Sequence, residues 1–275
     1  MLQQKDAIAR LLSDDDPLTV DLVKEQLVSN GGEALAELRE LLEDQNENVR
    51  RHVADVIAEI DARQASRELS IFCPLFPEEG DIEQASWLLA RAMLPGTCVE
   101  RYRGILDRHG LELRKLLQHA SHPSERIVVT SGYLCETHGF NGNTSDYYEA
   151  DNSLLPRILD TRCGIPISLT LLYMIIGRRA GMKIEGVNMP GHFLAMHDGV
   201  LFDPFENGRI MTLADCNSIL ERQNLTFGPE HLAIASPRVM FRRMLANMLY
   251  IFQNDGGEAQ AEHLAEWIKA LDRKK

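Results

Sequence analysis

The chain has 275 residues, of which 44% are hydrophobic and 25% are charged, and its formal net charge is −12. This length can bury a large core and leaves room for one or two domains plus an appendage. The negative charge and the lack of a long basic run in the sequence argue against a nucleic-acid backbone or an anionic membrane as the partner.

The N-terminal sequence MLQQKDAIARLLSDDD has no positive region followed by an apolar stretch, so we expect no signal peptide. No apolar run in the sequence reaches the ~20 residues that a membrane span needs. The five cysteines are scattered and show no CxxC spacing, which favours neither a disulfide framework nor a zinc site. We expect a cytoplasmic protein with no cofactor and no metal.

Amphipathic helices are predicted for the N-terminal part of the chain. Apolar residues recur every three or four positions between 18 and 63, with a polar turn at 44–48. The helix pair around this turn resembles one HEAT repeat, although a solenoid needs several such units. The region is therefore either a helical hairpin packed on the rest of the chain or a protein-binding arm. Two prolines in SIFCPLFP, residues 70–77, indicate a boundary.

The middle of the chain is predicted to hold several helices before a buried central one. We expect helices over 82–93, 99–109, 111–119, 127–137 and 154–160, with Gly110 separating the second from the third. Residues 139–156 are rich in Gly, Asn, Ser and Asp, which predicts a loop. The central helix should begin at Pro166 and stop at Gly181.

Three short strands are predicted after the central helix, over 183–188, 191–197 and 200–205. The dipeptide Asp198-Gly199 is a strong signal for a two-residue type I′ turn. Such a turn pairs His197 with Val200 and sets the register of the whole hairpin.

This register predicts the one constellation in the sequence that resembles chemistry. It places Asp203 opposite Leu194, and it places His192 on the same face as a diagonal neighbour of Asp203. His197 falls on the other face, which argues against a metal site of two histidines. A hydrolase that uses a metal held by His192, Asp203 and Glu206 is therefore the weakest hypothesis.

The predicted His192–Asp203 pair has two interpretations. A carboxylate among apolar side chains needs a partner, and a histidine in that position is held in one tautomer. This is the base and its orienting group in a catalytic triad. Alternatively, the pair is a buried hydrogen bond that only ties two strands together.

The run from Tyr147 to Gly208 resembles the core of the SirB-type proteins, a branch of the transglutaminase-like superfamily. The resemblance lies in Tyr147-Tyr148, Asn152-Ser153, Gly164-Ile165-Pro166-Ile167, Gly191-His192-Phe193 and Phe202-Asp203-Pro204-Phe205. It extends over roughly residues 82–254 and implies a papain-like α+β fold.

With this resemblance the chain divides into three expected regions. Residues 1–69 would form a HEAT-like helical arm. Residues 70–235 would form a transglutaminase-like core, a central helix packed on a small antiparallel sheet, with the helices that precede it. Residues 236–275 would form a helical hairpin similar to a tetratricopeptide unit. The fold class is therefore α+β.

The resemblance also implies a site. In active transglutaminase-like enzymes a Cys that begins the central helix attacks an amide or acyl carbonyl, a His moves the proton, and an Asp orients the His. His192 and Asp203 match the last two residues, but Pro166 stands where the Cys is expected. Cys163 lies three residues upstream of Pro166, and Ser168 lies two residues downstream.

Two functions stay open at this point. The first is a non-catalytic module that binds a protein or peptide partner or regulates it, with a cleft near Tyr147, Tyr148, Asn152, Ser168 and Asn188. The second is a thiol-dependent amide or acyl hydrolase, or acyltransferase, that uses Cys163, His192 and Asp203. The two loop tyrosines could also simply pin the loop to the body.

Overall fold

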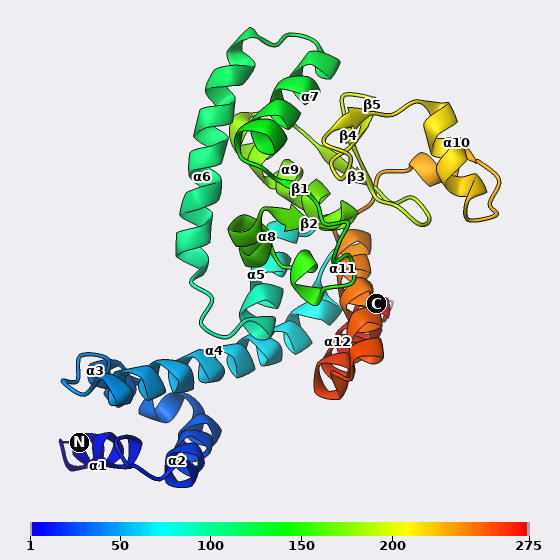
Figure 1. Ribbon diagram of the computed structural model, residues 1–275. Helices are drawn as coiled ribbons and strands as arrows, with labels where there is room; N and C mark the ends of the chain where they lie inside the picture. Colours follow the sequence, from blue (N-terminus) through cyan, green and yellow to red (C-terminus); the bar gives the residue numbers. More distant parts are fainter. Residues whose placement is uncertain (1, 274–275) are drawn as a thin grey trace. The chain divides into compact units, whose positions relative to one another are not determined.

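The computed structural model describes residues 2–273 of the chain (Figure 1). Contacts group these residues into two compact units. The first contains the chain up to Leu69 together with Leu88–Cys98, and the second contains Ser70–Trp87 and the chain from Val99 onward. Two helices, α4 (Glu47–Leu75) and α5 (Ile82–Met93), contribute residues to both units.

The first unit is helical, as its apolar periodicity predicts. It contains α1 (Leu2–Leu12), α2 (Pro17–Asn30), the 3-10 turn η1 (Gly31–Ala34), α3 (Leu35–Leu41) and most of α4. Its core is formed by buried aliphatic side chains, among them Leu38 and Val53. Pro74 lies inside α4, so this helix continues through most of the segment where the two prolines predicted a break.

Besides its parts of α4 and α5, the second unit contains the central helix and several helical elements that precede it. They are α6 (Val99–Leu116), η2 (Leu117–His119), α7 (Pro123–Ser131), the π-helical turn η3 (Gly132–Thr137), η4 (Ala150–Ser153), α8 (Leu155–Thr161) and the central helix α9 (Pro166–Ala180). The prediction of two helices separated by Gly110 is wrong, because α6 is continuous. A Cβ on Gly110 would lie 2.3 Å from Cβ of Arg179, so this glycine permits the close packing of α6 on α9.

The central helix forms where the sequence predicts it. Pro166 is its first residue, and Gly181 ends it in the left-handed region with φ of 78°. The Ser168 hydroxyl accepts a hydrogen bond from the backbone N–H of Ile165 at 3.0 Å, which caps the first turn. Twelve of the fifteen residues of α9 are buried, so the helix lies inside the core of the second unit.

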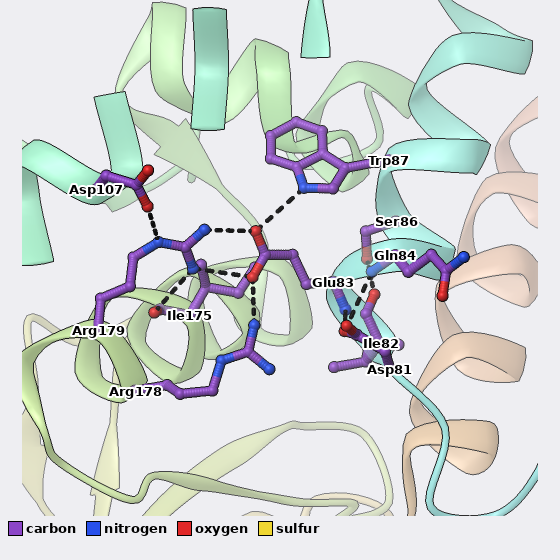
Figure 2. A network of polar contacts seen from close by, with 10 residues as sticks. All are labelled: Asp81, Ile82, Glu83, Gln84, Ser86, Trp87, Asp107, Ile175, Arg178 and Arg179. Atoms are coloured by element: carbon purple, nitrogen blue, oxygen red, sulfur yellow. Dashed lines mark hydrogen bonds and ion pairs between the residues drawn. The ribbon is translucent and has the colours of Figure 1, made fainter. Parts of the chain in front are cut away.

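A buried carboxylate anchors the far end of the central helix (Figure 2). Glu83 accepts hydrogen bonds from Arg179 at 2.7 and 2.8 Å, from Trp87 Nε1 at 3.2 Å, and from Arg178. Asp107 of α6 accepts from the other side of Arg179 at 2.6 Å. Burial alone would raise the pKa of Glu83, but the hydrogen bonds from Arg179 and Trp87 outweigh it and the pKa is lowered.

The main sheet has four antiparallel strands in the order β3 (Glu185–Val187), β4 (Leu194–His197), β5 (Val200–Asp203) and β6 (Arg209–Ile210). The predicted register of the hairpin is confirmed, since His197 pairs with Val200. Both turn residues, Asp198 and Gly199, have positive φ, as a type I′ turn requires. Strand β4 starts at Leu194, three residues later than predicted.

A second, two-stranded sheet precedes the central helix. Strand β1 (Asn141–Gly142) runs parallel to β2 (Cys163–Gly164), with Asn141 opposite Cys163. The chain ends with α10 (Leu213–Glu221), the 3-10 turn η5 (Pro229–Leu232), α11 (Pro237–Asp255) and α12 (Glu258–Asp272), of which the last two pack against each other (Figure 1). None of the helices within residues 2–273 combines the length and apolarity that a membrane crossing requires.

Candidate functional site

The predicted His–Asp pair is formed. His192 Nε2 lies 2.6 Å from Asp203 Oδ2, and the side chain of Asp203 is 1% exposed while that of His192 is 17% exposed. The second carboxylate oxygen, Oδ1, accepts a hydrogen bond from the backbone N–H of Phe205 at 2.9 Å. Both oxygens of this buried carboxylate are therefore satisfied.

The hydrogen bond to Asp203 determines which nitrogen of His192 is available. A carboxylate only accepts, so Nε2 donates and a neutral imidazole presents Nδ1 as an acceptor. Within residues 2–273 no protein group is hydrogen-bonded to Nδ1. The arrangement matches a general base and the carboxylate that orients it.

The backbone before β4 places His192. Its N–H donates to the carbonyl of Met189 at 3.1 Å, so His192 sits in a turn and not in the strand where it was predicted. Gly191 in this turn has φ of 71°, and a Cβ there would lie 2.7 Å from the Gln223 side chain. Glycine thus meets both the backbone requirement and the steric requirement of the turn.

Asn188 lies in the same segment between β3 and β4, and its side chain accepts a hydrogen bond from α11. The half-buried Arg243 of α11 donates to the Asn188 side chain, and to the Met189 carbonyl at 2.9 Å. The guanidinium also lies over the ring of Phe193 at 5.4 Å, and burial lowers the pKa of Arg243. Asn188 therefore takes part in supporting the turn that carries His192.

The position expected for a nucleophile holds a proline. Pro166 begins α9 and is buried. Cys163 lies in β2 and is half-buried, and its backbone N–H donates to Thr161 Oγ1 at 3.3 Å. Among the residues that the structure describes, no hydrogen bond joins Cys163 to His192.

Ser168 does not replace the missing thiol. Its side chain is fully buried, and its hydroxyl donates to the Asn152 carbonyl at 2.6 Å while it caps α9. Asn152 is buried too, and its amide nitrogen donates to the carbonyl of Asp146 at 2.7 Å. Both residues, predicted to line a cleft, instead form the internal framework of the loop before α8.

The two loop tyrosines are exposed and belong to a contiguous set of rings. Tyr147 is 37% exposed and Tyr148 is 64% exposed, and their ring centroids are 5.2 Å apart. Tyr147 contacts Phe205 edge-on at 6.0 Å, and Tyr148 contacts Tyr250 of α11 at 5.9 Å. We call Phe205, Tyr147, Tyr148 and Tyr250 the aromatic row.

The aromatic row starts beside the His–Asp pair. The ring of Phe205 lies 6.3 Å from the imidazole of His192. Tyr250 was not predicted as part of any site, because it lies on the exposed side of a helix about a hundred residues further along the chain. No local pattern in the sequence distinguishes it from other exposed residues of α11.

Three side chains could hold a metal ion, but they do not include His192 or Asp203. The ligand atoms of His109, Glu112 and His138 lie within 4.8 Å of one another. The Tyr133 hydroxyl already lies 2.8 Å from His109 Nδ1 and donates to Glu112 at 2.7 Å, so His109 Nδ1 and Glu112 have a hydrogen-bond partner without an ion. Glu206, proposed with His192 as a metal ligand, is exposed and pairs with Arg209 at 2.8 Å.

The fold and the pair define a class of protein: a helix-rich α+β protein whose buried central helix precedes an antiparallel hairpin with a His–Asp pair. Comparison with known families agrees with this class. The model of the transglutaminase-like superfamily matches residues 100–246, more than half of the chain. The chain belongs to the transglutaminase-like superfamily.

Individual relatives are proteins of the UPF0162 group and a eukaryotic protein. A UPF0162 protein of Xylella fastidiosa is 29% identical over 197 residues, which cover 67% of this chain and 69% of the relative. One of Pseudomonas aeruginosa is 36% identical over 177 residues, covering 60% and 62%. F-box only protein 21 of Mus musculus is 29% identical over 171 residues, covering 56% of this chain and 27% of that protein. No solved structure matches the chain.

Proposed function

We propose that the chain is a SirB-type member of its superfamily that works as a non-catalytic module for binding or regulating a protein partner. The proposal is supported chiefly by the residues at the start of α9, where the superfamily's enzymes have their nucleophile. A buried proline begins the helix. The hydroxyl of Ser168, in the first turn, is already hydrogen-bonded to the backbone of Ile165 and of Asn152. Proline has no nucleophilic side chain.

In such a module the His192–Asp203 pair has a structural role. Its 2.6 Å bond connects the turn before β4 with the end of β5, and the second carboxylate oxygen binds the backbone that begins the next turn. The pair thereby orients Phe205, at one end of the aromatic row. A binding module needs a fixed position of Phe205, but it does not need a thiol near His192 Nδ1.

Helices in the N-terminal part of the chain and the pair α11 and α12 would supply further contacts to the partner. We expect this partner to be in the cytoplasm. The HEAT-like arm and the tetratricopeptide-like pair α11 and α12 are helical elements of a kind often used to bind proteins. The match to a quarter of a longer F-box only protein is consistent with a module that is combined with other parts.

An activity screen tests the proposal. Wild type and a Cys163→Ala variant are incubated with a panel of amide and ester substrates, with and without an amine acceptor. We expect no turnover that differs between the two proteins. Turnover that disappears in Cys163→Ala would overturn the proposal.

A thiol hydrolase or acyltransferase is the second candidate function. It is favoured by the oriented His192, whose Nδ1 has no hydrogen bond within residues 2–273. In this case Cys163 would attack the acyl carbon, His192 would take up the thiol proton and then pass it to the leaving group, and water or an amine would release the acyl group. The Cys163 sulfur would first have to come within hydrogen-bonding reach of Nδ1.

A further inference from the structure

The aromatic row places three exposed tyrosine rings side by side. Tyr148 is 64% exposed, Tyr250 is 57% exposed and Tyr147 is 37% exposed, and the Tyr148 ring contacts both of the others. Tyrosine is enriched where proteins bind other proteins, since its ring gives a large contact area at a low entropic cost. This row is therefore a candidate binding surface.

Contacts with neighbouring parts of the protein fix the position of the aromatic row. Asn152 donates to the carbonyls of Asp146 and Tyr147, at 2.7 and 3.3 Å, and thus fixes the loop that carries the tyrosines. Gly142 of β1 lies under Phe205, and a Cβ there would be 2.6 Å from the Phe205 ring. Because the surface is already ordered, little conformational entropy is lost when a partner binds.

The loop that carries Tyr147 and Tyr148 is acidic. The loop from 139 to 156 contains Asp146, Glu149 and Asp151 and no Lys or Arg. Asp151 pairs with Arg157 at 3.0 Å, while Glu149 is exposed. Arg243, whose charge acts on Tyr147, is half-buried, and its guanidinium is bonded to Asn188 and Met189 and lies over the Phe193 ring, so it is engaged away from the exposed ring faces.

We infer that the aromatic row docks a basic segment of the partner protein, whose Arg or Lys side chains lie across the faces of Tyr148 and Tyr250. This inference rests on the proposed function and names the chemistry of the partner. A cation over a tyrosine face is attracted by the ring quadrupole, and the acidic loop adds a longer-range attraction. A nucleic acid could stack on the same rings, but its phosphates would be repelled by the loop.

A peptide titration tests the inference on the full chain. The probe is a short fluorescein-labelled peptide of Arg, Gly and Ser, followed by fluorescence polarisation. Two control peptides have Glu or the neutral isostere citrulline in place of each Arg. We expect the Arg peptide to bind wild type, the citrulline peptide to bind several-fold more weakly, and the Glu peptide not to bind. Equal binding of the Arg and citrulline peptides would overturn the inference.

Variants then locate the binding surface. Replacing Tyr148 or Tyr250 by Ala should weaken binding by about two- to fivefold each, the range of one exposed cation–π contact. Tyr148→Phe keeps the ring face and should bind within about twofold of wild type. Leu213→Ala, at a 61% exposed residue of α10, is the matched control and should have no effect. Circular dichroism verifies that each variant is folded.

The remaining outcomes are also decisive. An absence of binding to the Arg peptide, or binding that is unchanged in both tyrosine variants, overturns the inference but leaves the proposed function standing. Self-association that the tyrosine variants abolish would identify a second copy of the chain as the occupant and would also overturn it. The proposed function itself fails only on cysteine-dependent turnover, which this titration does not measure.

Discussion

His192 and Asp203 are joined by a 2.6 Å hydrogen bond between Nε2 and Oδ2, and Asp203 is the more deeply buried partner. Removing the side chain of one partner should therefore lower the free energy of unfolding, even if the protein has no activity. Removing the imidazole leaves a carboxylate oxygen buried and unpaired, which costs about 1–3 kcal/mol.

We accordingly expect His192→Ala to lower the free energy of unfolding by about 1–3 kcal/mol, measured by urea denaturation at neutral pH. His119→Ala is the control, since His119 is exposed. A change below about 0.5 kcal/mol in His192→Ala, similar to that of ordinary surface variants, would show that the pair does not stabilise the fold.

Ser168 should be a stability residue of the same kind. Its hydroxyl connects Ile165 with Asn152, and the Ser168→Ala variant leaves the buried carbonyl of Asn152 without this donor. We expect a loss of about 1–3 kcal/mol in the free energy of unfolding. Ser218→Ala, which removes an exposed hydroxyl of α10, should change stability by less than about 0.5 kcal/mol. Equal effects of the two substitutions would contradict the capping role.

Two glycines of the same helix should respond in opposite directions to alanine. Nothing lies within 4 Å of a Cβ built on Gly104, so Gly104→Ala should stabilise α6 by about 0.5–1 kcal/mol. A Cβ on Gly110 would clash with Arg179, and Gly110→Ala should destabilise the protein by about 1–3 kcal/mol. Urea denaturation of the two variants measures the difference, and stabilisation by both would show that α6 and α9 are not closely packed.

Stability should depend on pH through His109. Burial, followed by the charges of His138 and Arg162, lowers the pKa of His109 to about 4, whereas the ordinary value is 6.5. Below the ordinary value the unfolded chain binds a proton that the folded chain does not, so stability decreases as the pH falls from 6.5 toward 4. Between pH 7 and pH 5 the loss due to His109 is about 2 kcal/mol.

Unfolding of wild type and His109→Gln at these two pH values checks this expectation. The variant should lose about 2 kcal/mol less than wild type between pH 7 and pH 5. His119→Gln, an exposed control, should follow wild type. The same pH dependence in all three proteins would mean that His109 accepts a proton as readily in the folded state as in the unfolded state.

Local signals in the sequence were sufficient for the hairpin and the central helix. Asp198-Gly199 determines its turn through its own backbone preferences, and this turn sets the register that brings Asp203 near His192. Pro166 and Gly181 likewise define helix ends through their own φ angles. Such features depend on few residues, all close together in the chain.

Features that depend on distant residues were missed or misjudged. Gly110 was expected to end a helix, because the reason for a glycine there is the side chain of Arg179, on another helix. Tyr250 joins the aromatic row only through the packing of α11 near the loop of Tyr148. The burial of Ser168 likewise results from the fold of the loop around Asn152.

In the function proposed above, His192 does not activate a thiol. The most direct test is the rate at which a small electrophile such as iodoacetamide modifies Cys163, followed by peptide mass spectrometry in wild type and in His192→Ala, with the exposed Cys98 as an internal reference. We expect the ratio of the Cys163 rate to the Cys98 rate to be the same in both proteins. A selective modification of Cys163 in wild type that drops by about tenfold or more in His192→Ala would show instead that His192 activates Cys163, because a histidine-paired thiolate is far more reactive than an ordinary thiol.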